Sequence, residues 1–124
     1  MDRLQDLQST GFIHNDLKIN NFLLTRGKSL SDLVSWDNET SNYRVNREPL
    51  INIVDFGLSK RILSEDGKII VRNSNYSCGN NYFMSIRMQK VRAQGMRDDI
   101  ESMLYSLLFL LNGDIPWSIM KNLS

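Results

Sequence analysis

Four polar side chains in two short strings have types and an order that suit a shared chemical task. Asp16, Lys18 and Asn21 lie within one string. Asp55 opens an Asp-Phe-Gly string further along the chain. Asp16 would orient an attacking hydroxyl and accept its proton, and Lys18 would offset negative charge that develops on a transferred group. Positioning and charge neutralisation are the main needs of in-line phosphoryl transfer, so the strings point to that reaction class.

The other two side chains offer oxygen ligands of the kind that Mg²⁺ prefers. Asn21 supplies a neutral oxygen and Asp55 a charged one. Antiparallel pairing of two apolar runs, residues 22–24 and 51–54, would bring both ligands to the same end of one hairpin. The sequence therefore predicts a shared Mg²⁺ site on that hairpin, with the Asp16 carboxylate close by.

Each string alone also has an ordinary structural explanation. An Asp-x-Lys string on a loop is usually a solvated charge pair, and Asp-Phe-Gly is often a turn after a strand. We expect His14 to be a hydrogen-bonded core histidine and not a proton shuttle. The order of the strings, each beside a strand-like run, favours the chemical interpretation.

The remaining pattern predicts the elements that position these side chains. Residues 2–9 are expected to form a helix that stops near Gly11, followed by an extended pair at 12–13. Residues 25–49 predict a surface insertion on the hairpin, a solvated loop without stable structure of its own. Within this insertion, Leu30, Leu33, Val34 and Trp36 are expected to make a short amphipathic turn.

The second half of the chain predicts a small hairpin and one long helix. Asp66-Gly67 is a turn signal between the apolar runs at 62–63 and 69–71. Asp98 and Glu101 resemble an acidic N-cap with its reciprocal partner, and Gly113 marks the end of the helix. The apolar side chains of residues 100–111 surround the helix, as is typical of a helix buried in a core. Such a helix needs covering neighbours, so a partner for this central helix is expected.

Composition bounds the class of protein. A chain of 124 residues with 41% apolar content suits one small globular domain. The net charge of +1 predicts no nucleic-acid partner and no membrane attraction, and the apolar window is shorter than the about 20 residues of a membrane span. A single cysteine, Cys78, and a polar N-terminus without a signal peptide predict an intracellular location, cytoplasmic or nuclear.

Three stretches, residues 11–24, 51–60 and 79–117, resemble a eukaryotic-type serine/threonine protein kinase, and most closely the casein kinase 1 family. The string Arg-Asp-Asp-Ile-Glu-Ser at 97–102 is similar to that family's opening of its central helix. Phe-Met-Ser-Ile at 83–86 stands where the family has Tyr-Ala-Ser-Ile. Asn15, in place of the usual arginine, is also similar to the related vaccinia-related kinases.

The resemblance implies an α+β fold, that of a kinase C-lobe fragment, in which a short β-hairpin carries both loops beside a buried central helix. It implies ATP and Mg²⁺ as cofactors and a protein substrate that presents a serine or threonine hydroxyl. It also implies a role for each of these residues: Asp16 as catalytic base, Lys18 as phosphate contact, Asn21 and Asp55 as metal ligands, Leu23 and Val54 on the adenine side of the ATP cleft, and Asp99 as anchor of the catalytic-loop backbone.

Departures from the family pattern have consequences of their own. Asn15 removes the usual partner of a phosphorylated activation loop, so activation by that route is disfavoured. Asn80 stands for a threonine that normally braces the catalytic aspartate. Tyr82 stands for an arginine that the family uses to bind anions, which puts a preference for acidic or pre-phosphorylated substrates in question.

Two hypotheses follow from what the pattern lacks. Neither a Gly-rich loop nor a strand-borne lysine precedes His14, and the chain ends soon after the central helix. Residues 1–124 are therefore expected to be a partial kinase domain without N-lobe and C-terminal helices. The first hypothesis is the catalytic half of an active serine/threonine kinase. The second is a non-catalytic kinase remnant or binding module, and the isolated chain is expected to be inactive.

Overall fold

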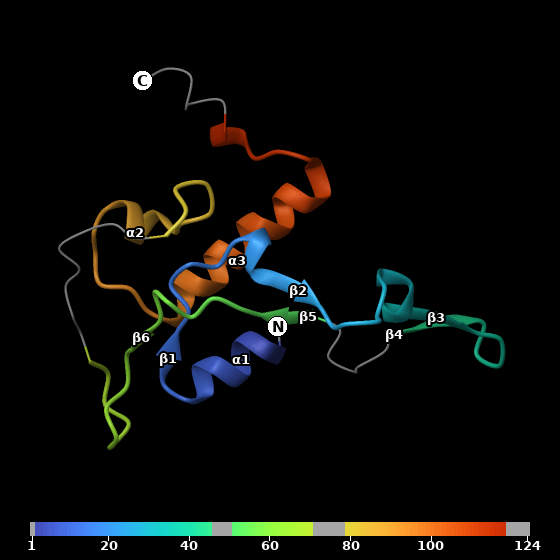
Figure 1. The fold of residues 1–124 in the computed structure, drawn as a ribbon, viewed down its shortest axis with the longest axis horizontal. Helices are drawn as coiled ribbons and strands as arrows, with labels where there is room; N and C mark the ends of the chain where they lie inside the picture. The colour runs from blue at the N-terminus through green and yellow to red at the C-terminus, as the bar shows by residue number, and fades with distance from the viewer. Residues whose placement is uncertain (1, 46–50, 71–78, 119–124) are drawn as a thin grey trace.

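The computed structural model describes residues 2–45, 51–70 and 79–118, in which helices are combined with small antiparallel sheets. Figure 1 shows the long helix α3 behind the β2–β5 pair, with α1 on the opposite side of that pair. The elements are α1 (Asp2–Ser9), β1 (Phe12–Ile13), β2 (Phe22–Leu24), β3 (Val34–Asp37), β4 (Asn42–Val45), β5 (Ile51–Ile53), β6 (Lys60–Arg61), α2 (Ile86–Gln89) and α3 (Met96–Asn112), with 3₁₀ turns at Ile19–Asn21 and Leu30–Leu33. This mixture agrees with the predicted α+β class.

The hairpin predicted to carry the two metal ligands is present. Strands β2 and β5 pair antiparallel, with Phe22 opposite Ile53 and Leu24 opposite Ile51. The ladder continues by one hydrogen bond of 3.0 Å, from the main-chain N–H of Val54 to the carbonyl oxygen of Asn21. Asn21 and the residue before Asp55 are therefore direct neighbours at one end of the hairpin.

The N-terminal helix forms over the predicted residues and packs against the centre of the molecule. Leu4 of α1, Leu17 and Met103 of α3 form the buried apolar cluster, and Phe22 and Ile53 of the hairpin pack against it. The chain leaves α1 through Gly11, whose φ of +83° is a left-handed conformation that glycine adopts readily. It then enters β1, which pairs with β6, so the extended pair at 12–13 is also confirmed.

The predicted N-cap of the long helix is wrong by three residues, because the N-cap is Gly95. Helix α3 begins at Met96, and Asp98 is its third residue, not its N-cap. The Asp98 carboxylate still caps the helix end, because it accepts a 2.7 Å hydrogen bond from the main-chain N–H of Gly95. Glu101 does not reciprocate, since it accepts a hydrogen bond from the N–H of Ile86. The helix ends at Asn112, with Gly113 in the left-handed conformation, as predicted.

The prediction that the central helix is buried all round is also wrong for the described part of the chain. Met103 is its only fully buried apolar residue there, whereas five leucines of α3 are 44–82% exposed: Leu104, Leu107, Leu108, Leu110 and Leu111. The buried face of α3 is instead lined by short polar side chains, those of Asp98, Asp99, Ser102 and Ser106. These side chains let the helix approach the loops it binds, so polar contacts decide which face is buried.

The insertion at 25–49 has regular structure that its sequence was not predicted to have. Strands β3 and β4 pair antiparallel from Val34 opposite Val45 to Asp37 opposite Asn42. The Trp36 and Tyr43 rings meet edge to face at 5.0 Å, and such aromatic pairs stabilise a hairpin. Figure 1 shows this hairpin extending away from the rest of the molecule. The predicted turn is present as the 3₁₀ turn Leu30–Leu33, whereas Val34 and Trp36 belong to β3.

The smaller hairpin around Asp66-Gly67 is confirmed as a single bridge. Leu63 pairs antiparallel with Ile69, and the N–H of Ile70 donates to the carbonyl of Ile62. Val71 and Cys78 lie outside the described residues. Within the part of the chain that the structure describes, no helix combines the length and the apolar character needed to cross a bilayer.

Candidate functional site

The loop that carries Asp16, residues 14–21, is anchored from beneath by helix α3. The Asp99 carboxylate accepts hydrogen bonds from the main-chain N–H groups of His14, at 2.7 Å, and Asn15, at 2.8 Å. All three residues are buried. A carboxylate that satisfies two buried N–H groups fixes the path of the loop, because an unpaired buried donor is costly. The geometry agrees with the anchoring role that the family resemblance implies for Asp99.

His14 ties the same loop to the strand end before Asp55. Its Nδ1 atom accepts a hydrogen bond from the N–H of Asp16 at 3.3 Å, so the ring proton is assigned to Nε2. Nε2 then donates to the carbonyl oxygen of Val54 at 2.9 Å. The Phe56 ring packs on the imidazole at a centroid distance of 5.1 Å. His14 is fully buried, which confirms the prediction of a hydrogen-bonded core histidine.

The Asp16 carboxylate is held by one donor on each oxygen. Lys18 Nζ lies 2.8 Å from Oδ2, and the main-chain N–H of Asn80 donates to Oδ1 at 3.1 Å. Asp16 is 8% exposed and the Lys18 side chain is 25% exposed, so the pair is accessible from one side. Hydrogen bonds to an ionised acceptor are stronger than neutral ones and restrict its orientation.

Asn21 links the Asp16 loop to the β2–β5 hairpin. Its side-chain amide donates to the main-chain oxygen of Asp16 at 2.9 Å, and its own main-chain oxygen accepts from Val54. Because Nδ2 makes the bond to Asp16, the Oδ1 atom is the side-chain group left to accept a ligand. The side chain is buried, so its orientation is fixed by this bond.

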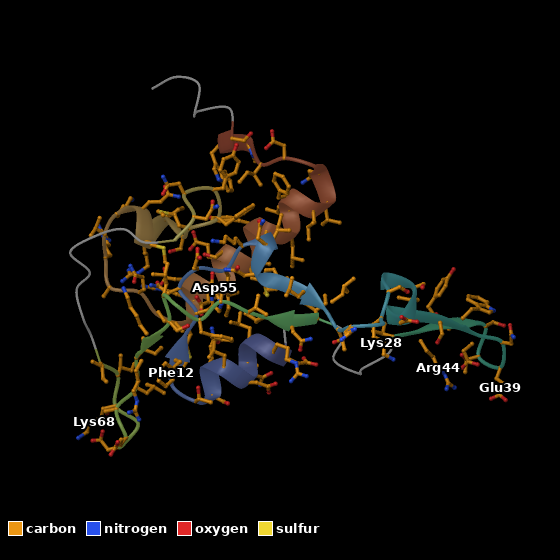
Figure 2. All side chains as sticks on the ribbon, viewed as in Figure 1. Phe12, Lys28, Glu39, Arg44, Asp55 and Lys68 are labelled. Carbon is orange, nitrogen blue, oxygen red and sulfur yellow. The ribbon has the colours of Figure 1, made fainter. Side chains whose placement is uncertain are left out.

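Asp55 lies on the exposed surface beside this hairpin end, and Figure 2 shows it at the centre of the molecule near α3. Among the described residues, its Oδ1 atom receives only a long contact of 3.4 Å, from the N–H of Gly57. The φ of Asp55 is +65° and that of Asn15 is +68°, in a region that residues other than glycine adopt at a cost. Strained backbone of this kind is concentrated at functional sites, and here it occurs in both predicted strings.

Asn21 and Asp55 carry oxygens of the type that Mg²⁺ binds together with substrate phosphates. Among the described residues, no group of three or more His, Cys, Asp or Glu side chains could hold a metal ion by itself. Mg²⁺ does not require such a group, because it commonly binds one or two protein oxygens together with phosphates and water. Asn21 Oδ1 and the exposed Asp55 carboxylate are oxygens of that kind, carried by adjacent positions of one hairpin end.

The two residues assigned to the adenine side have different surroundings. Leu23 of β2 is 50% exposed, and Val54 is partly buried where its carbonyl meets His14. Their contact with a nucleotide stays a prediction, as do the roles assigned to Asp16, Lys18, Asn21 and Asp55.

Burial raises the pKa of the Asp99 carboxyl above its ordinary 3.8, and the hydrogen bonds from Asn15 and His14 partly oppose this effect. The neighbouring Asp98 raises the Asp99 pKa further through its negative charge. Asp99 therefore resists ionisation while its ionised form is the better acceptor for the loop.

Sequence reasoning missed how residues 79–85 contact the site. Asn80 was predicted to replace a bracing threonine side chain, yet it reaches Asp16 through its main-chain N–H, and its side chain accepts from the N–H of Tyr82. Ser85 at the other end of this segment donates to the Asp98 carboxylate at 2.6 Å. The one sequence signal for this contact is Gly79, since a glycine permits close approach of two backbones.

Comparison with known proteins finds a sequence relative among the casein kinases. The chain is 30% identical over 130 residues to Casein kinase I homolog 3 of Saccharomyces cerevisiae, a match that covers 98% of this chain and 24% of that protein. No protein-family profile matches the chain. The chain thus spans about a quarter of the length of the curated relative. The similarity supports a casein kinase 1-like relationship.

Proposed function

We propose that this chain carries the catalytic and metal-binding part of a serine/threonine protein kinase of casein kinase 1 type, which transfers the γ-phosphate of ATP to a protein hydroxyl. The observation that supports it best is the chain of contacts from Lys18 to Asp16, from Asp16 to Asn21, and from Asn21 to the residue before Asp55. These contacts link the predicted base, the predicted phosphate contact and the predicted metal ligand Asn21, and they end at the residue before the other predicted metal ligand, Asp55.

Asp16 acts on the hydroxyl that attacks. Its carboxylate accepts from two donors, and the substrate hydroxyl approaches from the exposed side and gives up its proton there. The donors hold the carboxylate in one orientation, so little reorganisation is needed when the hydroxyl arrives.

Lys18 neutralises charge beside that carboxylate. Its ammonium group already contacts Asp16 at 2.8 Å and has further N–H donors for a phosphoryl oxygen. The attacking oxygen and the transferred group would thus meet between a carboxylate and an ammonium.

Asn21 and Asp55 would hold Mg²⁺ through their side-chain oxygens. The ion would supply positive charge that offsets the negative charge of the ATP phosphates. Asn21 donates a hydrogen bond to the main-chain oxygen of Asp16, so a substitution of this metal ligand would also disturb the loop that carries the base.

The second candidate function is a non-catalytic remnant or binding module. The observation that favours it is the row of exposed leucines on α3, because large exposed apolar patches mark interaction sites. This candidate predicts partner binding without any need for ATP.

Titration of the purified chain with Mg·ATP, followed by calorimetry, separates the two candidates. The kinase proposal expects binding that Asp55→Ala abolishes and that Asp66→Ala, a change at an exposed turn carboxylate, leaves intact. It also expects transfer of labelled phosphate to a mixed protein substrate that Asp16→Asn removes. Absence of heat up to about millimolar ATP, together with no transfer, would contradict the proposal for this chain and favour the remnant.

A further inference from the structure

We infer that the Gly79–Asn80 peptide group is a positioning element for the Asp16 carboxylate, with glycine required at position 79. The inference rests on the proposed function for its kinetic part and on geometry alone for its structural part. It differs from the sequence expectation, in which a side chain at position 80 would brace Asp16.

The contact is made by the backbone and not by a side chain. The main-chain N–H of Asn80 donates to Asp16 Oδ1 at 3.1 Å. The Asn80 side chain is committed elsewhere, because its Oδ1 accepts from the N–H of Tyr82 at 2.8 Å. The Asn80 carbonyl accepts from Phe83 and Met84, so a tight turn holds the donating peptide group in place.

Gly79 leaves the space that this contact needs. A Cβ atom at position 79 would lie 3.1 Å from the carbonyl oxygen of Asn15 and 3.3 Å from Asp16 Oδ1. Both distances are tighter than ordinary contacts, and a main-chain oxygen of a buried loop has little freedom to withdraw. The φ of Gly79 is +95°, which adds strain for any other residue.

The segment is anchored at its far end to the helix that anchors the Asp16 loop. Ser85 is fully buried and donates to Asp98, while the adjacent Asp99 binds the N–H groups of His14 and Asn15. Neighbouring carboxylates of α3 therefore set the positions of both the peptide group that donates to Asp16 and the loop that carries Asp16.

The test compares two glycines that share a positive φ but differ in their surroundings. Gly27 has a φ of +78° with nothing within 4 Å of an added Cβ, so Gly27→Ala introduces backbone strain without a contact to Asp16. Gly79→Ala is expected to lower kcat for phosphate transfer by about 10-fold or more relative to Gly27→Ala, since small displacements of a reacting group have large effects. The KM for ATP should change less, because Asp16 acts on the hydroxyl.

A second measurement does not depend on activity. Amide hydrogen exchange, followed by NMR in the complete chain, should show faster exchange at Asn80 in Asp16→Ala and in Gly79→Ala. The Gly95 amide, which donates to Asp98, serves as the internal reference and should be unaffected. Equal kcat values for Gly79→Ala and Gly27→Ala would overturn the inference. If the unmodified chain transfers no phosphate, the proposed function fails, and the Asn80 exchange rate alone then decides: unchanged protection in both variants would overturn the inference, and lost protection would support it.

Discussion

The main-chain N–H of His14 donates a 2.7 Å hydrogen bond to Asp99 Oδ2, across 85 positions of sequence. Together with the bond from Asn15, it makes Asp99 the residue on which the path of the Asp16 loop depends. The relationship leads to predictions that can be checked without any assumption about activity.

Asp99→Asn should destabilise the fold. The substituted amide keeps one oxygen but presents an NH₂ group to one of the two main-chain donors, which then loses its acceptor. Loss of a hydrogen bond to a charged group costs about 1.5–3 kcal/mol, so the urea midpoint should fall. Asp66→Asn, at an exposed turn, is the matched control and should have a much smaller effect; equal midpoints for the two variants would contradict the anchoring role.

The part of the free energy of unfolding that is linked to protonation of Asp99 should decrease as pH rises. Its folded-state pKa is raised above 3.8, so the folded state binds the proton more tightly than the unfolded state. The stabilisation is therefore complete below pH 3.8 and is lost as pH rises through the higher folded-state value. The ¹³C shift of the Asp99 carboxyl should titrate with a midpoint above 3.8, and a midpoint below that value would show that the two hydrogen bonds outweigh burial.

Val91→Gly should stabilise the protein. Val91 has a φ of +53° and directly follows Lys90, the C-cap of helix α2; its N–H bonds to Met88 and the N–H of Arg92 bonds to Arg87. Glycine is the usual residue at this position of such a helix end, and a left-handed conformation costs other residues about 1–2 kcal/mol. Part of that gain is offset by the greater freedom of glycine in the unfolded chain, so we expect a net gain of up to about 1 kcal/mol.

Thermal unfolding provides the measurement for Val91→Gly. Gly113→Ala provides the reverse change, because Gly113 has a φ of +76° at the end of α3 and open space around an added Cβ. The two variants should shift the midpoint in opposite directions. A lower midpoint for Val91→Gly would mean that the valine side chain contributes packing that outweighs its strain.

Tyr105 should ionise at unusually high pH. Burial, with the hydrogen bond to Glu101 and its negative charge, raises the Tyr105 pKa to about 12. The hydrogen bond is 2.7 Å long, and the same Glu101 oxygen accepts from Ile86, so it joins α3 to α2. Because the pKa of Tyr105 is raised in the folded state, the stabilisation by its protonated hydroxyl is present below pH 10.0. It is lost as pH rises toward about 12. The tyrosinate absorbance that Tyr105→Phe removes should therefore appear above pH 10.0, and its appearance below that pH would contradict the contact.

Local signals in the sequence were sufficient to predict an element where the adjacent residues along the chain decide its conformation. The short apolar runs predicted β2 and β5, and their antiparallel pairing followed because Asn21 and Asp55 needed a common end. The end of α3 at Gly113 was likewise predicted, since a left-handed helix end favours glycine.

Other features depended on contacts between distant residues. Asp98 was predicted as an N-cap, but Ser85 and Gly95 both use its carboxylate, which places it inside the first turn of α3. The apolar pattern of α3 indicated which side chains would gain from burial, yet the loops bind its polar face. The alternating Val34 and Trp36 were a strand signal that the polar composition of the insertion obscured.

The adjacent carboxylates of α3 have a mechanical consequence. Asp98 holds the segment that donates to the Asp16 side chain, and Asp99 holds the loop from which that side chain extends. A small rotation of the helix would carry both segments together as one rigid unit. The base and its donor would then keep their separation, while their distance from Asp55 on the hairpin would change.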